Sequence, residues 1–144
     1  MTQKEIDLQM QKLKMQYAKR RNEIARQKDD VNRDKMAALL QADDAFHSER
    51  RVRISKINLI RAEKAALFEG DPKKAVLEAE ARKIESEIAL MRADNEQRKR
   101  TIVNEAYANR RALDEQSRQL SEWYEDFKLA ILENADKDIE FEFK

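Results

Sequence analysis

The chain has 144 residues but contains a single glycine and a single proline, which lie close together near its midpoint as Gly70 and Pro72. A chain of this length with average composition would hold about seventeen such residues. Sheets and their hairpins need turn residues, so nearly all of this chain is expected to be helical or disordered. Compositional disorder requires a large net charge, whereas 30 Lys and Arg residues are balanced here by 29 Asp and Glu residues. The sequence therefore predicts helix.

The segment around Gly70 has the features of one helix ending and another beginning. Helix one is expected over about 3–69, with Gly70 in the left-handed conformation just past its end. Asp71 suits the N-cap of helix two, because its carboxylate can accept from free backbone N–H groups. Pro72 suits the first helical position, since its missing N–H costs nothing there. Helix two is expected over about 72–134.

A link this short favours antiparallel neighbours. We therefore predict an all-α fold, a long antiparallel two-helix hairpin resembling a coiled coil, with its turn at 70–71. The hairpin would form one domain, 1–135, followed by a short extended tail, 136–144. In the alternative arrangement the two helices splay apart at the turn, and each pairs with another subunit.

Apolar residues recur at every seventh position of helix one, which is typical of a coiled-coil seam. They are Met10, Tyr17, Ile24, Val31, Ala38, Ala45, Val52, Leu59 and Ala66. Helix two offers a seam with a phase shift, formed by Leu77, Ala81, Ile84, Ile88 and Met91 and then by Ala106, Leu113, Leu120 and Phe127. An eleven-residue series, formed by Met91, Ile102, Leu113, Tyr124 and Ala135, indicates a locally straighter or oppositely wound stretch. The weakest core is expected near 18–35 and 92–112.

Charge placement supports the antiparallel pairing. With the turn centred near residue 71, the numbers of two residues that face each other add up to about 142. Asp43 and Asp44 would then face the basic run 98–100, and the pair Arg110 and Arg111 would face an acidic group. That group is Asp29, Asp30 and Asp34. Several matched clusters of this kind favour one register over others.

The sequence lacks the residues that most enzyme sites need. One glycine cannot make a phosphate-binding loop, the single histidine, His47, cannot form a histidine pair, and no cysteine is present. No stretch is apolar enough to span a membrane or to serve as a signal peptide. We therefore expect a protein that is not an enzyme and that has no cofactor, metal, small-molecule or membrane partner. It is expected in the cytoplasm, or within a virion if viral.

One group of basic residues is a candidate for contacting nucleic acid. It consists of Arg50, Arg51, Arg53 and Lys56. Basic side chains on one helix face could neutralise phosphates. The net charge of only +1 argues against this role, and a solvated helix face is the alternative explanation.

Aromatic residues near the end of helix two are candidates for binding a protein partner. Trp123 and Tyr124 belong to residue types that often anchor interfaces, although they could instead pack against the start of helix one. In the tail, Ile139, Phe141 and Phe143 alternate with charged residues, so an extended strand would place them on one side. Such a strand could dock on a sheet edge of another protein; a frayed terminus is the alternative.

In general character the chain resembles helical assembly proteins such as phage scaffolding or virion components, helical chaperones and coiled-coil adaptors. We therefore expect a non-enzymatic scaffold or adaptor that spaces or docks components of a larger assembly, such as a phage or virion. The alternative function is a helical protein that binds nucleic-acid backbone. A homo-oligomer is also expected, with apolar residues off the seam forming a four-helix bundle. These residues are Leu39, Phe46, Ile60 and Leu67.

Overall fold

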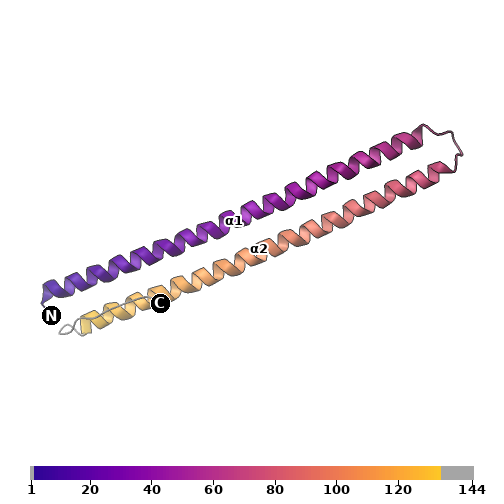
Figure 1. Cartoon of the computed structure of the whole chain (residues 1–144). Coiled ribbons are helices and arrows are strands. Elements are labelled where there is room, and N and C mark those ends of the chain that lie inside the picture. Colours follow the sequence, from indigo (N-terminus) through magenta and orange to yellow (C-terminus); the bar gives the residue numbers. More distant parts are fainter. Residues whose placement is uncertain (1, 134–144) are drawn as a thin grey trace. The chain divides into compact units, whose positions relative to one another are not determined.

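The computed structural model describes residues 2–133, which form two α-helices, α1 (Gln3–Ala65) and α2 (Lys73–Glu133) (Figure 1). The helices run antiparallel and pack against each other, so the predicted all-α two-helix hairpin is confirmed. The predicted tail, 136–144, lies outside the described residues.

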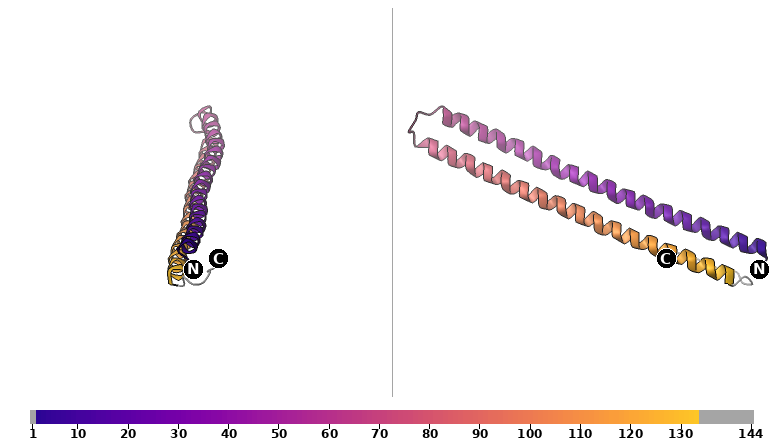
Figure 2. Two further views of the ribbon diagram at one scale, coloured as in Figure 1. Left: turned by 90° about the vertical axis from the view of Figure 1, so that its left-hand side faces the viewer. Right: turned by 180° about the vertical axis from the view of Figure 1, so that it is seen from behind.

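The chain divides into two compact units. The terminal unit comprises the residues up to Asp34 together with those from Glu105 onward, and the turn unit comprises Lys35–Asn104. Within each unit a segment of α1 lies beside a segment of α2, as the views in Figures 1 and 2 agree in showing. The boundaries between the units fall in the stretches for which the sequence predicts the weakest core.

The connection between the helices is longer than predicted. α1 ends at Ala65, about four residues early, and its last turn tightens as the Leu67 N–H donates to the Lys64 carbonyl at 3.2 Å. A β-turn follows, in which the Asp71 N–H donates to the Phe68 carbonyl at 3.2 Å. Gly70 has a φ of +88° and is the third residue of this turn, which makes it a type II turn. Gly70 therefore serves a β-turn and does not directly follow the helix end.

The predicted N-cap of the second helix is confirmed. The Asp71 carboxylate accepts from the Lys73 backbone N–H at 2.9 Å, and the Asp71 carbonyl accepts from the Lys74 N–H at 3.1 Å. Pro72 lies between cap and helix, where its missing N–H leaves no donor unsatisfied. The regular hydrogen-bonded helix begins at Lys73, one residue after the predicted start.

The terminal unit is held together mainly by apolar packing. Its buried side chains are Leu13, Ile24, Leu113, Leu120 and Ile131. Three of them, Ile24, Leu113 and Leu120, form one cluster, against which the partly buried Val31 packs. Lys28 adds an ion pair to Asp114 at 2.7 Å on the other helix.

The turn unit buries less apolar surface and has more ion pairs between its helices. Its buried apolar residues are Ala42, Ile57 and Ala81, two of which are alanines. Ion pairs join α1 to α2 as Asp43–Lys99 (3.3 Å), Arg53–Glu87 (3.5 Å), Lys64–Glu78 (2.9 Å) and Arg61–Glu85. Each exposed pair contributes only about 0.2–1 kcal/mol, but together they favour one register.

The predicted register is confirmed by ion pairs in both units. The residue numbers add up to 142 in Lys28–Asp114, Asp43–Lys99 and Lys64–Glu78. The other predicted match is not formed: within residues 2–133, Arg110 and Arg111 make no ion pair with the acidic group near residue 30. Asp30 pairs instead with Arg33 on its own helix.

The predicted seven-residue seam of α1 is only partly correct. Its members up to Ala38 are buried or half-buried, but Ala45, Val52, Leu59 and Ala66 are exposed. The buried and half-buried positions of α1 instead repeat every eleven residues in three series. These are Ile6, Tyr17, Lys28, Leu39 and Arg50; Gln9, Arg20, Val31, Ala42 and Arg53; and Leu13, Ile24, Lys35, Phe46 and Ile57.

Helix geometry explains the discrepancy. In a straight helix a seven-residue series turns by about 20° per repeat, so eight repeats carry it through roughly 160°. The series from Met10 to Ala66 crosses the contact with α2 obliquely. It is most deeply buried at Ile24, which is 1% exposed, and leaves the contact after Ala38. An eleven-residue repeat corresponds to about 3.67 residues per turn, so it stays on one side of a nearly straight helix.

The predicted seam of α2 is confirmed. Every predicted member within the described residues is buried or half-buried, in both the seven-residue and the eleven-residue series. The residues proposed for a four-helix bundle, however, are not free. Leu39, Phe46, Ile60 and Leu67 are all half-buried within the turn unit. The eleven-residue register brings Leu39 and Phe46 toward α2, and Leu67 follows the end of α1.

Replacing Gly70 by alanine tests the connection. The space beside Gly70 is open, with no atom within 4 Å of the position a Cβ would take, so the substitution adds no clash. The left-handed backbone should still cost about 1–2 kcal/mol of unfolding free energy, and Gly70→Asn should cost less because asparagine tolerates this conformation better. Urea unfolding followed by circular dichroism measures both. Equal unfolding free energies of Gly70→Ala and the parent would contradict the left-handed backbone assigned to Gly70.

The ion pairs predict a pH dependence. Hydrogen bonds from Asn95 and Lys99 lower the pKa of Asp43, and the hydrogen bond from Lys64 lowers the pKa of Glu78. A carboxyl with a lower pKa in the folded state stabilises the fold above its unfolded pKa of about 4, and this contribution is lost as the pH falls through the folded value. The unfolding free energy should therefore fall below about pH 4.

Asp43→Asn should make this loss shallower, since it removes one of the titrating groups. Asp44→Asn is the matched control, because it removes the neighbouring, exposed carboxylate. The measurement is urea unfolding at a series of pH values. An identical pH profile for Asp43→Asn and the parent would contradict a stabilising role for the Asp43–Lys99 pair.

Candidate functional site

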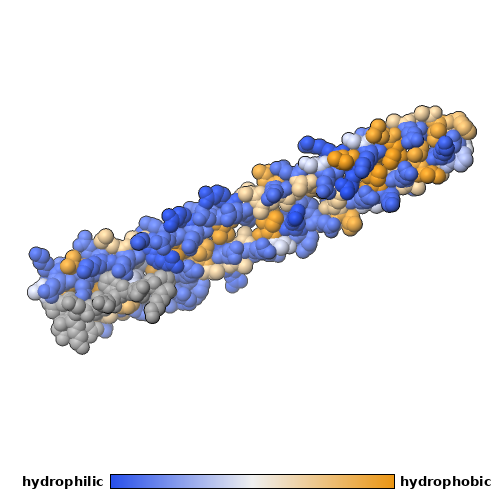
Figure 3. Space-filling view, viewed as in Figure 1, coloured by the Kyte–Doolittle hydropathy of each residue, from blue (hydrophilic) through white to orange (hydrophobic). Residues whose placement is uncertain are grey.

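The connection between the helices presents an exposed aromatic side chain. Phe68 is 71% exposed, and Val76 in the first turns of α2 is 60% exposed. Ala66 and Ala75 beside them are also exposed. We call these four residues the tip surface. In the space-filling view apolar residues gather at the turn end of the hairpin (Figure 3).

The backbone that carries Phe68 is fixed by hydrogen bonds. Its carbonyl is the acceptor of the β-turn, Gly70 supplies the one positive φ that this turn needs, and Asp71 caps α2 directly afterwards. Phe68 is therefore displayed on a defined turn. An apolar side chain held in this way is pre-organised for binding, because little conformational freedom remains to be lost.

Charged side chains near the connection hold the two helices together. Lys64 donates to Glu78 at 2.9 Å, and Glu78 also lies 3.4 Å from Arg82 on its own helix. The Lys64–Glu78 pair therefore joins α1 to α2 close in sequence to the connection that carries Phe68.

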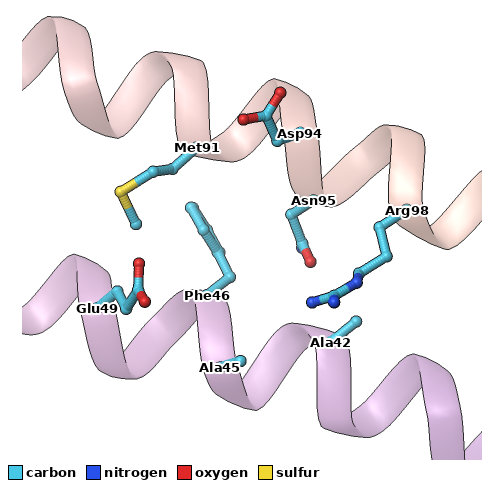
Figure 4. Close-up of a pocket in the computed structure, with 8 residues that line it drawn as sticks. All are labelled: Ala42, Ala45, Phe46, Glu49, Met91, Asp94, Asn95 and Arg98. Atoms are coloured by element: carbon cyan, nitrogen blue, oxygen red, sulfur yellow. The ribbon is translucent and has the colours of Figure 1, made fainter.

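A shallow hollow of about 260 Å³ lies between the helices of the turn unit (Figure 4). It is lined by Ala42, Ala45, Phe46, Glu49, Met91, Asp94, Asn95 and Arg98. The hollow exists because α1 contributes two alanines here. Phe46 extends from α1 toward α2 beside Met91, and Asn95 points toward α1, where its side-chain amide donates to Asp43 at 3.0 Å. The hollow can accept an apolar side chain.

The four predicted nucleic-acid contacts do not form one face. Arg53 lies 3.5 Å from Glu49 and 3.5 Å from Glu87, so two carboxylates already share its charge. Arg50 is half-buried in the contact with α2, whereas Arg51 and Lys56 are exposed. At 3.6 residues per turn, positions 51 and 56 point about 140° apart. These residues therefore flank the contact with α2 on different sides.

The two aromatic residues predicted to bind a partner lie in the terminal unit. Trp123 is partly buried against the cluster of Ile24, Leu113 and Leu120. The Tyr124 ring lies 4.5 Å from the Tyr17 ring, measured between centroids. Both aromatic residues therefore take part in packing, and their role as partner anchors stays a prediction. The other predicted anchors, Ile139, Phe141 and Phe143, lie outside the described residues.

Sequence reasoning did not select Phe68 as a functional candidate. The signal was present, because an aromatic residue two positions before the only glycine belongs to a turn, and turns lie on the surface. The seven-residue apolar series was likewise assigned to the core along its whole length, so the exposure of Val52 and Leu59 was missed.

Comparison of the chain with protein-family models, with curated proteins and with solved structures finds no match. Within residues 2–133, neither helix has an apolar stretch long enough to cross a bilayer.

A double-mutant cycle tests whether Tyr124 is committed to packing. Tyr17→Leu and Tyr124→Leu are measured singly and together by urea unfolding. Because aromatic pairs contribute about 0.5–1.5 kcal/mol beyond their buried area, we expect a coupling free energy in that range. The same cycle between Tyr107 and Tyr124 is the control, since Tyr107 is 64% exposed on the same helix. A coupling of zero between Tyr17 and Tyr124 would leave Tyr124 available as a partner anchor.

Proposed function

We propose that this chain is a non-enzymatic helical scaffold that docks a protein partner through its tip surface and spaces it within a larger assembly. The observation that carries the proposal is the exposure of Phe68 on a turn fixed by its own hydrogen bonds. A large aromatic side chain gains most when it enters a pocket of a partner, and aromatic residues are enriched at the centres of interfaces.

The two paired helices support the spacing role. Each helix exceeds 60 residues, and their mutual contact uses ion pairs as well as apolar packing. Fixed pairing keeps a docking surface at a defined place, which a flexible linker would not do. The wider class, assembly components including those of virions, follows from the general character of the sequence.

Nucleic-acid binding is less well supported. Its best candidate, Arg53, is paired with two glutamates, and the remaining basic residues of the group point in different directions. A binding face for phosphates would need several unpaired cations side by side. We therefore do not adopt this alternative.

The proposal predicts that Phe68→Ser weakens partner capture. A photo-crosslinking amino acid at position 75, one of the four positions of the tip surface, should yield a defined crosslinked protein from an extract of the native source. Phe68→Ser should weaken capture of that protein about 30-fold, which corresponds to the loss of about 2 kcal/mol at an interface hot spot.

Leu40→Ser is the matched control. Leu40 is 64% exposed on α1, away from the tip surface, so its replacement should leave capture unchanged. Circular dichroism should show unaltered helix content for both variants. Equal capture by Phe68→Ser and the parent would refute docking through the tip surface.

A further inference from the structure

Part of the seven-residue apolar series on α1 stays largely exposed in the hairpin. Val52 and Leu59 are 55% and 72% exposed, and Ala45, which lines the hollow of the turn unit, is also exposed. The positions between them at coiled-coil spacing, Ser48, Ser55 and Ala62, are small and exposed as well. We call these six residues the outer stripe.

The outer stripe has the pattern of a second coiled-coil seam. Ala45, Val52 and Leu59 occupy one core position of three successive heptads, and Ser48, Ser55 and Ala62 occupy the other. The intramolecular contact follows an eleven-residue repeat and does not require this pattern. A seven-residue repeat matches a helix that winds around another helix. The stripe is therefore suited to a helix from outside the hairpin.

We infer that the outer stripe is the contact through which two copies of this chain associate, antiparallel and about a twofold axis. The axis passes between the levels of residues 53 and 54, so that Val52 lies opposite Ser55 of the second copy. Leu59 then lies opposite Ser48, and Ala45 opposite Ala62. Each of these facing pairs contains at most one large side chain, so the two stripes interdigitate without leaving large gaps.

The charges that flank the stripe favour this antiparallel arrangement. In antiparallel coiled coils the residues that follow the second core position face each other. These residues are Glu49, Lys56 and Glu63. In the proposed register Glu49 of one copy lies beside Lys56 of the other, and twofold symmetry repeats the pair. Glu49 is 64% exposed along its side chain and is accessible for this contact.

The same charges oppose a parallel dimer. In a parallel coiled coil, the residue directly before the first core position of a heptad faces the residue with a number five higher on the partner helix. Asp44 would then face Glu49, and Arg51 would face Lys56. Symmetry would double both repulsive pairs, so like charges would meet at four places. The charges beside the stripe therefore favour antiparallel over parallel pairing of two copies.

This contact is separate from the tip surface, and it replaces the four-helix bundle expected from Leu39 and Phe46, which are half-buried in the turn unit. The outer stripe covers about 26 Å of helix, at 1.5 Å per residue. Contacts of this size lie at the small end of specific interfaces, so the association is expected to be weak and reversible.

Analytical ultracentrifugation of the full chain between 1 µM and 1 mM tests the inference. The parent should show a monomer–dimer equilibrium. Leu59→Glu should weaken dimerisation by at least 100-fold, because it puts a charge in place of the largest apolar side chain of the stripe. Leu40→Glu, at an equally exposed position off the stripe, should leave the dissociation constant unchanged.

Charge exchange provides the specific readout. Lys56→Glu and Glu49→Lys should each weaken the dimer about 5-fold or more, because each turns two attractive pairs into repulsive ones. The double variant, Glu49→Lys with Lys56→Glu, should restore the parent affinity. If either single substitution weakened the dimer by disturbing the fold of the chain, the double variant would not restore the affinity.

The direction of packing is measured with spin labels at an introduced cysteine, which is unique because the chain has none. Labels at position 45 should be roughly 25–30 Å apart in the antiparallel dimer, since 17 residues of helix separate the two sites along the axis. Three results would overturn the inference: a monomer at 1 mM, a dimer unaffected by Leu59→Glu, or label distances below about 15 Å, which a parallel dimer would give.

Discussion

The contact between the two helices is the constraint on which the other features of this chain depend. A helix of more than 60 residues can keep one side against a straight neighbour only if its buried positions repeat about every eleven residues. The buried positions of α1 meet this condition even where the residues are charged, as at Lys28, Lys35 and Arg53. Long basic side chains can cover apolar surface with their methylene groups and place their charge at the edge of the contact. The ion pairs between the helices follow from this placement.

The charged contact positions also decide what sequence reasoning can reach. The direction and register of pairing were predictable, because Gly70, Asp71 and Pro72 have specific backbone requirements and Asp43 can be matched with Lys99 by counting from the turn. The half-buried positions of Lys28 and Lys35 were not predictable, since a search for apolar repeats passes over charged residues. The uninterrupted seven-residue series was therefore taken as the core, although its second half faces outward. The end of α1 was misplaced for a local reason, because a type II turn requires residues on both sides of Gly70.

The two proposed binding surfaces share one physical origin. The large side chains of both are apolar residues that the contact between α1 and α2 does not bury, either because the helix has turned them away or because the chain has left the helix. Val52 and Leu59 belong to the first kind, and Phe68 to the second. The turn unit compensates for its small apolar core with ion pairs, which tolerate water at their edges. Exposed apolar surface and a polar internal contact therefore occur in the same part of the chain.

The eleven-residue repeat has a consequence for how such a chain can change its length during evolution. Inserting or deleting a single residue in one arm would rotate all following positions by about 100° and bring polar residues into the contact. An insertion of eleven residues in α1, matched by eleven in α2, would preserve both the facing sides and the register across the pair. Three turns of helix add about 16 Å. Paired duplications of this size would thus let the arms lengthen in discrete steps while leaving the turn around Gly70 untouched.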